Sequence, residues 1–124
     1  MAKVTPEQLP KAFAEIVEKY KDDLVSATND VVRDMGRKTA AAVRTSASAV
    51  TKGKYARNWT FTVEGRVNPT AIIYNRVPGL PHLIEFGHAK RNGGRVPGKP
   101  HVKPVEDKAV IEFEKELIKK LENL

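Results

Sequence analysis

The glycine-rich basic segment from Gly93 to Lys99 has part of the spacing of a phosphate-binding loop. In such a loop glycine amides surround the phosphates, a lysine contacts them, and the next residue supplies a hydroxyl for magnesium. Here the next residue is Pro100, which has no hydroxyl and no backbone N–H. Since no buried strand is predicted before the segment, we interpret it as an exposed basic loop.

His82, Glu85 and His88 follow one another at steps of three residues, and imidazole and carboxylate groups are metal ligands. Gly87 is expected to interrupt any helix before His88, and the spacing matches no zinc motif, so we predict no metal or cofactor. Glu85 is also a charge between the apolar residues Ile84 and Phe86. Such a carboxylate requires a partner, and we expect an Arg or Lys of this chain or of a neighbouring subunit.

A mixture of basic and aromatic side chains lies between residues 52 and 59, namely Lys52, Lys54, Tyr55, Arg57 and Trp59. Proteins that bind single-stranded nucleic acids combine these two residue types. Trp59 also fits the inward face of a strand, so core packing is the alternative interpretation.

No Ser, His and Asp residues show the spacing of a known hydrolase motif, and the absence of cysteine removes thiolate nucleophiles and disulfides. We therefore expect a protein that is not an enzyme. The 124 residues suffice for one domain, residues 1–124. No apolar run is long enough to cross a membrane, and residues 1–6 lack the apolar stretch of a signal peptide, so we expect neither a membrane protein nor a secreted one.

The net charge of +7 is unevenly distributed along the chain. Residues 33–105 hold fourteen Lys or Arg and three acidic residues, whereas residues 1–32 and 106–124 each hold four Lys and six acidic residues. A basic central region attracts phosphate or an acidic protein surface. Charge alone does not distinguish these partners.

A long amphipathic helix is predicted over residues 1–48, beginning with a capping box at Thr5-Pro6-Glu7-Gln8. Its apolar residues recur at steps of three and four: Leu9, Phe13, Ile16, Val17, Tyr20, Leu24, Ala27, Val31 and Met35. Gly36 leaves two alternatives, one helix or two segments bent at that position. In a domain this small, such a helix is expected to pack against neighbouring subunits.

Residues 45–56 are predicted to form a loop because they are rich in Ser, Thr, Ala, Gly and Lys. Alternating apolar residues then predict an antiparallel β-hairpin over residues 57–76, with Trp59 and Phe61 on one face. Residues 82–86 fit either a helical turn or a third strand.

Residues 87–103 are predicted to form an exposed basic loop or arm, followed by a second amphipathic helix over 104–124. The predicted fold class is therefore α+β: a long N-terminal and a C-terminal helix packed on one face of a small antiparallel sheet, with an extended basic loop.

Three segments in this order resemble the neck proteins of long-tailed bacteriophages, known as tail-component, head–tail joining or tail-completion proteins. They are residues 51–59 (TKGKYARNW), 82–88 (HLIEFGH) and 99–104 (KPHVKP). The residues that match the family's motifs are Gly53, Tyr55 and Asn58, then Ile84, Glu85, Phe86 and Gly87, then Pro100, Val102 and Pro104. Departures from the pattern are Lys52 between Thr51 and Gly53, and His101 and Val105 near the start of the last helix.

The resemblance implies a structural virion protein, made in the host bacterial cytoplasm, that forms a ring of six or twelve copies in the neck, in the head–tail connector or at the end of the tail. Its expected partners are further copies of itself, adjacent neck, connector or tail proteins, and DNA in the lumen. The expected interface residues are Gly53, Tyr55, Asn58, Glu85, Phe86, Gly87, Arg91, Arg95, Lys99, Pro100 and Lys103. The alternative is a small basic nucleic-acid-binding protein.

Overall fold

The computed structural model describes residues 9–51 and 53–124. Its elements are α1 (Leu9–Val50), a short 3-10 helix η1 (Ala56–Asn58), β1 (Trp59–Glu64), β2 (Thr70–Asn75), α2 (Leu80–Phe86), β3 (Gly87–Ala89), β4 (Arg95–Pro97) and α3 (Lys103–Glu122). The α+β class predicted from the sequence is confirmed. The predicted capping box at residues 5–8 lies outside the described residues.

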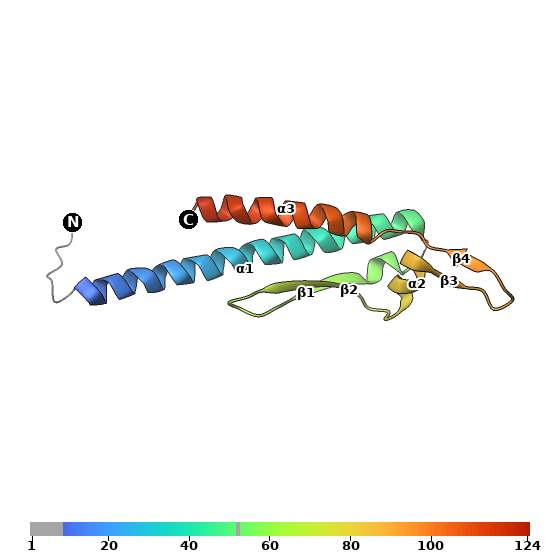
Figure 1. The fold of residues 1–124 in the computed structure, drawn as a ribbon, viewed down its shortest axis with the longest axis horizontal. Coiled ribbons are helices and arrows are strands. Elements are labelled where there is room, and N and C mark those ends of the chain that lie inside the picture. The colour runs from blue at the N-terminus through green and yellow to red at the C-terminus, as the bar shows by residue number, and fades with distance from the viewer. Residues whose placement is uncertain (1–8, 52) are drawn as a thin grey trace.

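Helix α1 is continuous over 42 residues, a length of about 60 Å at 1.5 Å per residue. It passes through Gly36 without interruption (Figure 1). A Cβ atom at Gly36 would lie 2.7 Å from Cδ2 of Phe61 and 3.2 Å from Cβ of Ala71. Gly36 therefore allows the β1–β2 hairpin to approach the helix closely, and this packing offsets the low helix propensity of glycine.

The C-terminal end of α1 corrects the loop prediction for residues 45–56, because the helix continues to Val50. Hydroxyl groups of Thr45 and Ser48 donate hydrogen bonds to the carbonyls of residues 41 and 44, one turn earlier. Ala47 between them is completely buried in the core. Burial of this turn outweighs the weak helix propensity of its Ser and Thr residues.

Strands β1 and β2 form an antiparallel hairpin in which Trp59 pairs with Asn75 and Phe61 pairs with Ile73. Phe61 faces Gly36 of α1, and Trp59 belongs to the core cluster that includes Val43 of the same helix. Both aromatic side chains therefore lie on the face of the sheet that α1 covers, as their alternation predicted.

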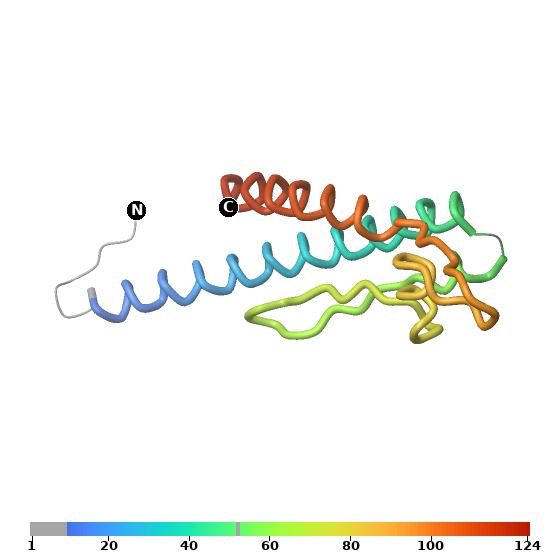
Figure 2. The backbone as a smooth tube through the Cα atoms, turned by 45° about the vertical axis from the view of Figure 1, so that its right-hand side comes forward, coloured from blue at the N-terminus to red at the C-terminus, as the bar shows by residue number. Residues whose placement is uncertain are grey.

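The arrangement of the helices differs in one respect from the predicted layers. Helix α1 lies between the hairpin and α3, with the hairpin along one side and α3 running antiparallel along another (Figures 1 and 2). Helix α3 turns a half-buried apolar stripe toward α1: Val105, Ala109, Phe113, Leu117 and Leu121. The C-terminal helix thus packs mainly on the long helix rather than beside it on the sheet.

The prediction that residues 87–103 form a loop or arm is corrected by the structure of residues 80–103. Residues 82–86 belong to the helix α2. Strands β3 and β4 form a second antiparallel hairpin within the segment predicted as a loop, with His88 opposite Val96. Residues 99–102 then pack back toward the core, where His101 is completely buried.

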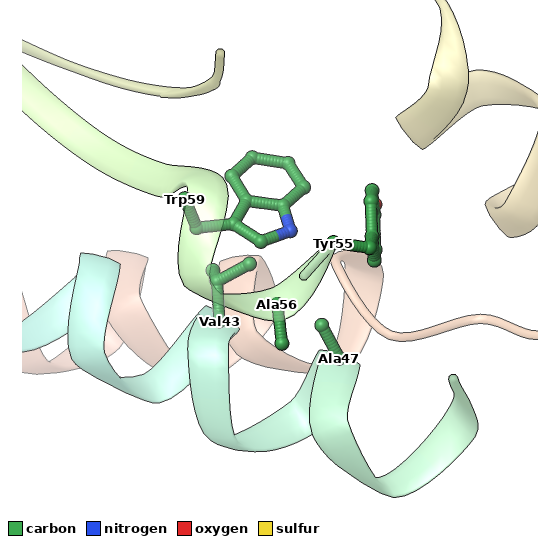
Figure 3. Packing of buried hydrophobic residues seen from close by; sticks show 5 residues of the cluster. All are labelled: Val43, Ala47, Tyr55, Ala56 and Trp59. Carbon is green, nitrogen blue, oxygen red and sulfur yellow. The ribbon is translucent and has the colours of Figure 1, made fainter. Parts of the chain in front are cut away.

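The central core cluster consists of five buried residues, shown in Figure 3: Val43, Ala47, Tyr55, Ala56 and Trp59. Half-buried side chains from β2, α2 and α3 pack against it, so the core lies at the C-terminal end of α1. No described helix combines the length and the apolar character needed to cross a membrane.

The opposite end of α1 extends beyond the other described elements. Near the end of α3, Lys120 lies 3.8 Å from the Asp30 carboxylate. At the hairpin turn, the Asn29 side chain donates to the carbonyl oxygen of Arg66 at 2.7 Å. Residues 10–23 lie past both contacts, and none of them is buried. We call residues 10–23 the projecting segment.

Candidate functional site

The three segments that carry the motif resemblance meet at one end of the molecule. Tyr55 comes from the turn after α1, Glu85 from α2, and His101 from the segment before α3. The Tyr55 hydroxyl lies 2.6 Å from Nε2 of His101, and Nδ1 of His101 lies 3.1 Å from Oε1 of Glu85. We call these three residues the joint, because they connect elements that are far apart in the sequence.

Glu85 holds the beginning of α3. Its Oε1 accepts the backbone N–H groups of His101 at 2.6 Å and Val102 at 2.9 Å, and its Oε2 accepts that of Lys103 at 3.0 Å. The residue at the start of α3, Val102, has no side chain that could cap the helix. A carboxylate from α2 therefore supplies the cap, at the end where the helix dipole favours a negative charge.

Within the described residues, Glu85 forms no ion pair with an Arg or Lys, which corrects the expectation for this chain, and a partner from a neighbouring subunit stays a prediction. Among the described residues, its side-chain partner is the His101 ring, and its main ligands are backbone N–H groups. Burial opposes the charged form of the carboxyl, but the three N–H donors and the nearby imidazole outweigh burial and lower its pKa. Glu85 is thus held as a carboxylate by the segment that it positions.

The geometry around His101 fixes its tautomer. Nδ1 lies 2.8 Å from the carbonyl oxygen of Lys99 and close to the Glu85 carboxylate, so both neighbours are acceptors. We therefore assign the proton to Nδ1, which leaves Nε2 to accept a hydrogen bond from the Tyr55 hydroxyl. Burial raises the pKa of Tyr55, and the negative charge of Glu85 adds to this effect.

Neighbouring polar groups are connected to the joint. The buried Asn75 side chain donates to the carbonyl oxygen of Tyr55 at 3.0 Å and accepts the N–H of Val77 at 2.9 Å. The Trp59 ring stands edge-on to those of Tyr55 and His101, with centroids 6.1 and 6.4 Å apart. Its buried Nε1 has no hydrogen-bond partner among the described residues.

Two glycines allow the β3–β4 hairpin to lie against α2. Gly87 has φ +77°, and a Cβ atom there would lie 2.2 Å from the carbonyl oxygen of Val96. A Cβ atom at Gly98 would lie 2.5 Å from the carbonyl oxygen of Glu85. The clashing atoms are backbone atoms that cannot turn away, so only glycine fits at either position.

Other residues expected at an interface have different surroundings. Gly53 is exposed, with φ +94° and no atom within 4 Å of a Cβ placed there. Asn58 is half-buried, and its backbone N–H donates to the carbonyl oxygen of Tyr55. Phe86 is 62% exposed and lies against His82, with ring centroids 5.0 Å apart.

The expected basic contact residues lie on or next to the second hairpin, and all are exposed. Arg91 is in the turn between β3 and β4, and Arg95 begins β4 while donating to the carbonyl oxygen of Phe86 at 2.7 Å. Lys99 and Pro100 follow β4, and the N–H of Lys99 donates to the carbonyl oxygen of residue 84. Lys103 forms an ion pair with Asp107 at 3.0 Å.

Neither the candidate metal ligands nor the candidate phosphate-binding loop forms a site within the described part of the chain. The carboxylate of Glu85 is directed at the backbone of residues 101–103 rather than toward His82 and His88. Within residues 9–51 and 53–124, no group of three His, Cys, Asp or Glu side chains is arranged to hold a metal ion. The segment from Gly93 to Lys99 contains the end of a hairpin turn and β4.

Sequence reasoning missed the central position of His101 and the role of Asn75. His101 stands between Pro100 and Val102, in a segment with neither helical nor strand periodicity. The sequence around it therefore contains no pattern that would predict its burial. Asn75 ends a predicted strand, where an exposed amide would be equally ordinary.

Comparison of the chain with models of known protein families, with curated proteins and with solved structures gives no match.

Proposed function

We propose that this chain is a structural protein of a long-tailed bacteriophage that assembles with copies of itself into a ring in the neck or head–tail connector, or at the end of the tail. The observation that carries the proposal is the projecting segment of α1. Its apolar side chains are largely exposed: Phe13 by 66%, Ile16 by 67% and Tyr20 by 59%. A monomer gains nothing from such a stripe, whereas an assembly covers it.

The joint supports the same proposal because it accounts for the motif resemblance in structural terms. Glu85 and Gly87 fix the start of α3 and the position of the second hairpin, and Tyr55 connects both to the end of α1. In a ring, subunits must be held in one shape so that successive contacts close. A rigid connection between the elements serves that requirement.

The experiment is to locate the protein in particles and to remove it. In the phage that encodes this chain, labelled protein should be found at the head–tail junction or at the end of the tail. Particles made without the protein should contain heads and tails that do not join, or tails that lack their normal end. Normal, infectious particles without the chain would contradict the proposal.

A second candidate, nucleic-acid binding, is favoured by the charge of the β3–β4 hairpin. Residues 86–105 contain Lys90, Arg91, Arg95, Lys99 and Lys103 and no acidic residue. DNA binding by these groups would weaken steeply as salt rises. Tight, salt-sensitive binding by a monomer that never assembles would favour this candidate over the structural one.

A further inference from the structure

The projecting segment of α1 presents its apolar stripe without any cover from the described chain. Phe13, Ile16, Val17 and Tyr20 recur at steps of three and four, so they lie on one side of the helix. Their exposed fractions range from 42% to 67%. Farther along the helix, Ala27, Val31 and Met35 are buried. The stripe thus continues past the point where the described part of the chain stops covering it.

A groove of about 350 Å³ lies between α1, β2 and α3. Its lining includes Val32 and Met35 of α1, Ala71 and Ile73 of β2, and Val110 and Phe113 of α3. None of the residues that line it is ionisable, whereas the larger groove on α1 and α3 contains Lys38, Lys108 and Glu112. Val110 is 63% exposed at this groove. The groove therefore suits apolar side chains.

The stripe of one molecule cannot reach its own groove. Phe13 and Met35 belong to the same continuous helix, and 22 positions at 1.5 Å separate them by about 33 Å. Any occupant of the groove must come from elsewhere, and any cover for the stripe must be another molecule or another part of the chain outside this helix.

The charges favour a second copy of this chain as the molecule that covers the stripe. Residues 10–23 hold Lys11, Lys19 and Lys21 against Glu15, Glu18, Asp22 and Asp23. On the α1 side of the groove, residues 32–39 hold Arg33, Arg37 and Lys38 against Asp34. A slightly acidic projecting segment is thus attracted to that side of the groove. Pairing two stripes would bring segments of like net charge together and leave the groove open.

We propose that the Phe13–Tyr20 stripe of one copy docks into the α1–β2–α3 groove of the next, forming a head-to-tail contact. The inference rests on the self-assembly in the proposed function and specifies the two surfaces involved. Two different surfaces meet in this contact, so each copy offers one free stripe and one free groove, and repetition gives rings or open chains.

Two variants test the stripe and the groove separately. Phe13→Gln/Ile16→Gln removes the apolar stripe, and Val110→Glu places a negative charge in the groove. Each has a matched control of similar exposure: Val67→Gln at the β1–β2 turn, where Val67 is 66% exposed, and Ile111→Glu on α3, where Ile111 is 58% exposed and does not line the groove. Circular dichroism melting shows whether each variant is folded.

The measurement is the mass of the particle in solution by sedimentation velocity over a range of concentrations. The wild-type chain and both controls should form particles larger than a dimer. The stripe variant and the groove variant should each weaken self-association at least about 100-fold, because a central apolar contact dominates such an interface. Controls should change it by less than about threefold.

Mixing the two defective variants gives the decisive result. The intact groove of one and the intact stripe of the other form a single good contact, so the mixture should stop at a one-to-one dimer. A mixture that remains monomeric while the wild type assembles would overturn the inference, because the intact stripe of one variant would then fail to bind the intact groove of the other. Normal assembly of folded Val110→Glu would also overturn it.

Failure of this inference is distinguishable from failure of the proposed function. A wild-type chain that remains monomeric at every concentration overturns the stripe-and-groove contact. Its place in the phage particle is tested separately, by labelling the particles and by removing the chain from them.

Discussion

The two ends of α1 differ in what covers them. At the C-terminal end, Tyr55, Glu85 and His101 are buried, and their polar groups bind one another or the backbone. At the N-terminal end, Phe13 and Tyr20 are exposed, and none of residues 10–23 is buried. The polar joint thus connects the elements of the protomer, whereas the exposed apolar end is the surface that we propose for association. Residue type alone therefore does not identify which end is the core.

The largest expected effect is at the joint's neighbour Gly87. Gly87→Ala should destabilise the protein by about 4 kcal/mol, because its Cβ would clash with backbone and its φ is positive. Gly93→Ala is the matched control: φ is +94° there, but no atom lies within 4 Å of a Cβ. That change should cost about 1 kcal/mol. Urea unfolding measures both, and equal losses would contradict the close approach at Gly87.

Glu85→Ala should have the next largest effect and lower the free energy of unfolding by about 3 kcal/mol. It leaves the backbone N–H groups of residues 101–103, at the start of α3, without their acceptor. Glu85→Gln keeps one acceptor oxygen and should lose less. Glu64→Gln, at an exposed position of β1, is the control and should change the free energy of unfolding by less than about 0.5 kcal/mol. Equal effects of Glu85→Gln and Glu64→Gln would show that the Glu85 charge has no stabilising role.

Acid should weaken the same contact. Folding lowers the pKa of Glu85, so the folded state holds its proton less tightly than the unfolded state, where the ordinary value is 4.5. The contribution of Glu85 is therefore present above pH 4.5 and is lost as the pH falls through the lower folded-state pKa. Thermal melting from pH 6 to pH 2 should show a smaller acid-induced loss for Glu85→Gln than for the wild type.

Tyr55→Phe should have a smaller effect, about 1 kcal/mol. It removes the hydroxyl that lies 2.6 Å from Nε2 of His101 while keeping the ring that packs against Trp59. Tyr74→Phe is the control, since Tyr74 is 42% exposed on β2. A Tyr55→Phe protein as stable as the control would show that the hydroxyl contributes nothing net.

The smallest effect on folding should come from the projecting segment. Phe13→Gln should change the free energy of unfolding of the monomer by less than about 0.5 kcal/mol, because the side chain is 66% exposed and has little buried surface to lose. The measurement needs dilute protein, in which the chain is monomeric. Destabilisation comparable to Tyr55→Phe would mean that this end of α1 is already covered within one molecule.

Elements with a repeating apolar pattern could be predicted from the sequence, whereas single long-range contacts could not. Periodicity predicted α1, the β1–β2 hairpin and α3, because each buries a regular apolar face. It failed at residues 45–50, where burial of Ala47 extends the helix into a segment rich in Ser and Thr.

The candidate site shows the same limit. The need of Glu85 for a partner could be predicted from its apolar neighbours. The partner itself could not, because backbone N–H groups of residues 101–103 are the same in every sequence. The exposed charges of Arg91 and Lys99 were predicted from composition, whereas the β3–β4 pairing beside them depends on the close approach at Gly87 and Gly98.

The unbroken length of α1 gives the joint a mechanical consequence. A continuous helix acts as a lever, so a tilt of about 5° at Gly36, where the hairpin packs on it, moves Phe13, about 35 Å away, by about 3 Å. Small changes in packing around Gly36 or Ala47 are therefore amplified into the direction in which Phe13 points. The angle between successive copies in any assembly built on that tip is set by side chains tens of ångströms away from the contact itself.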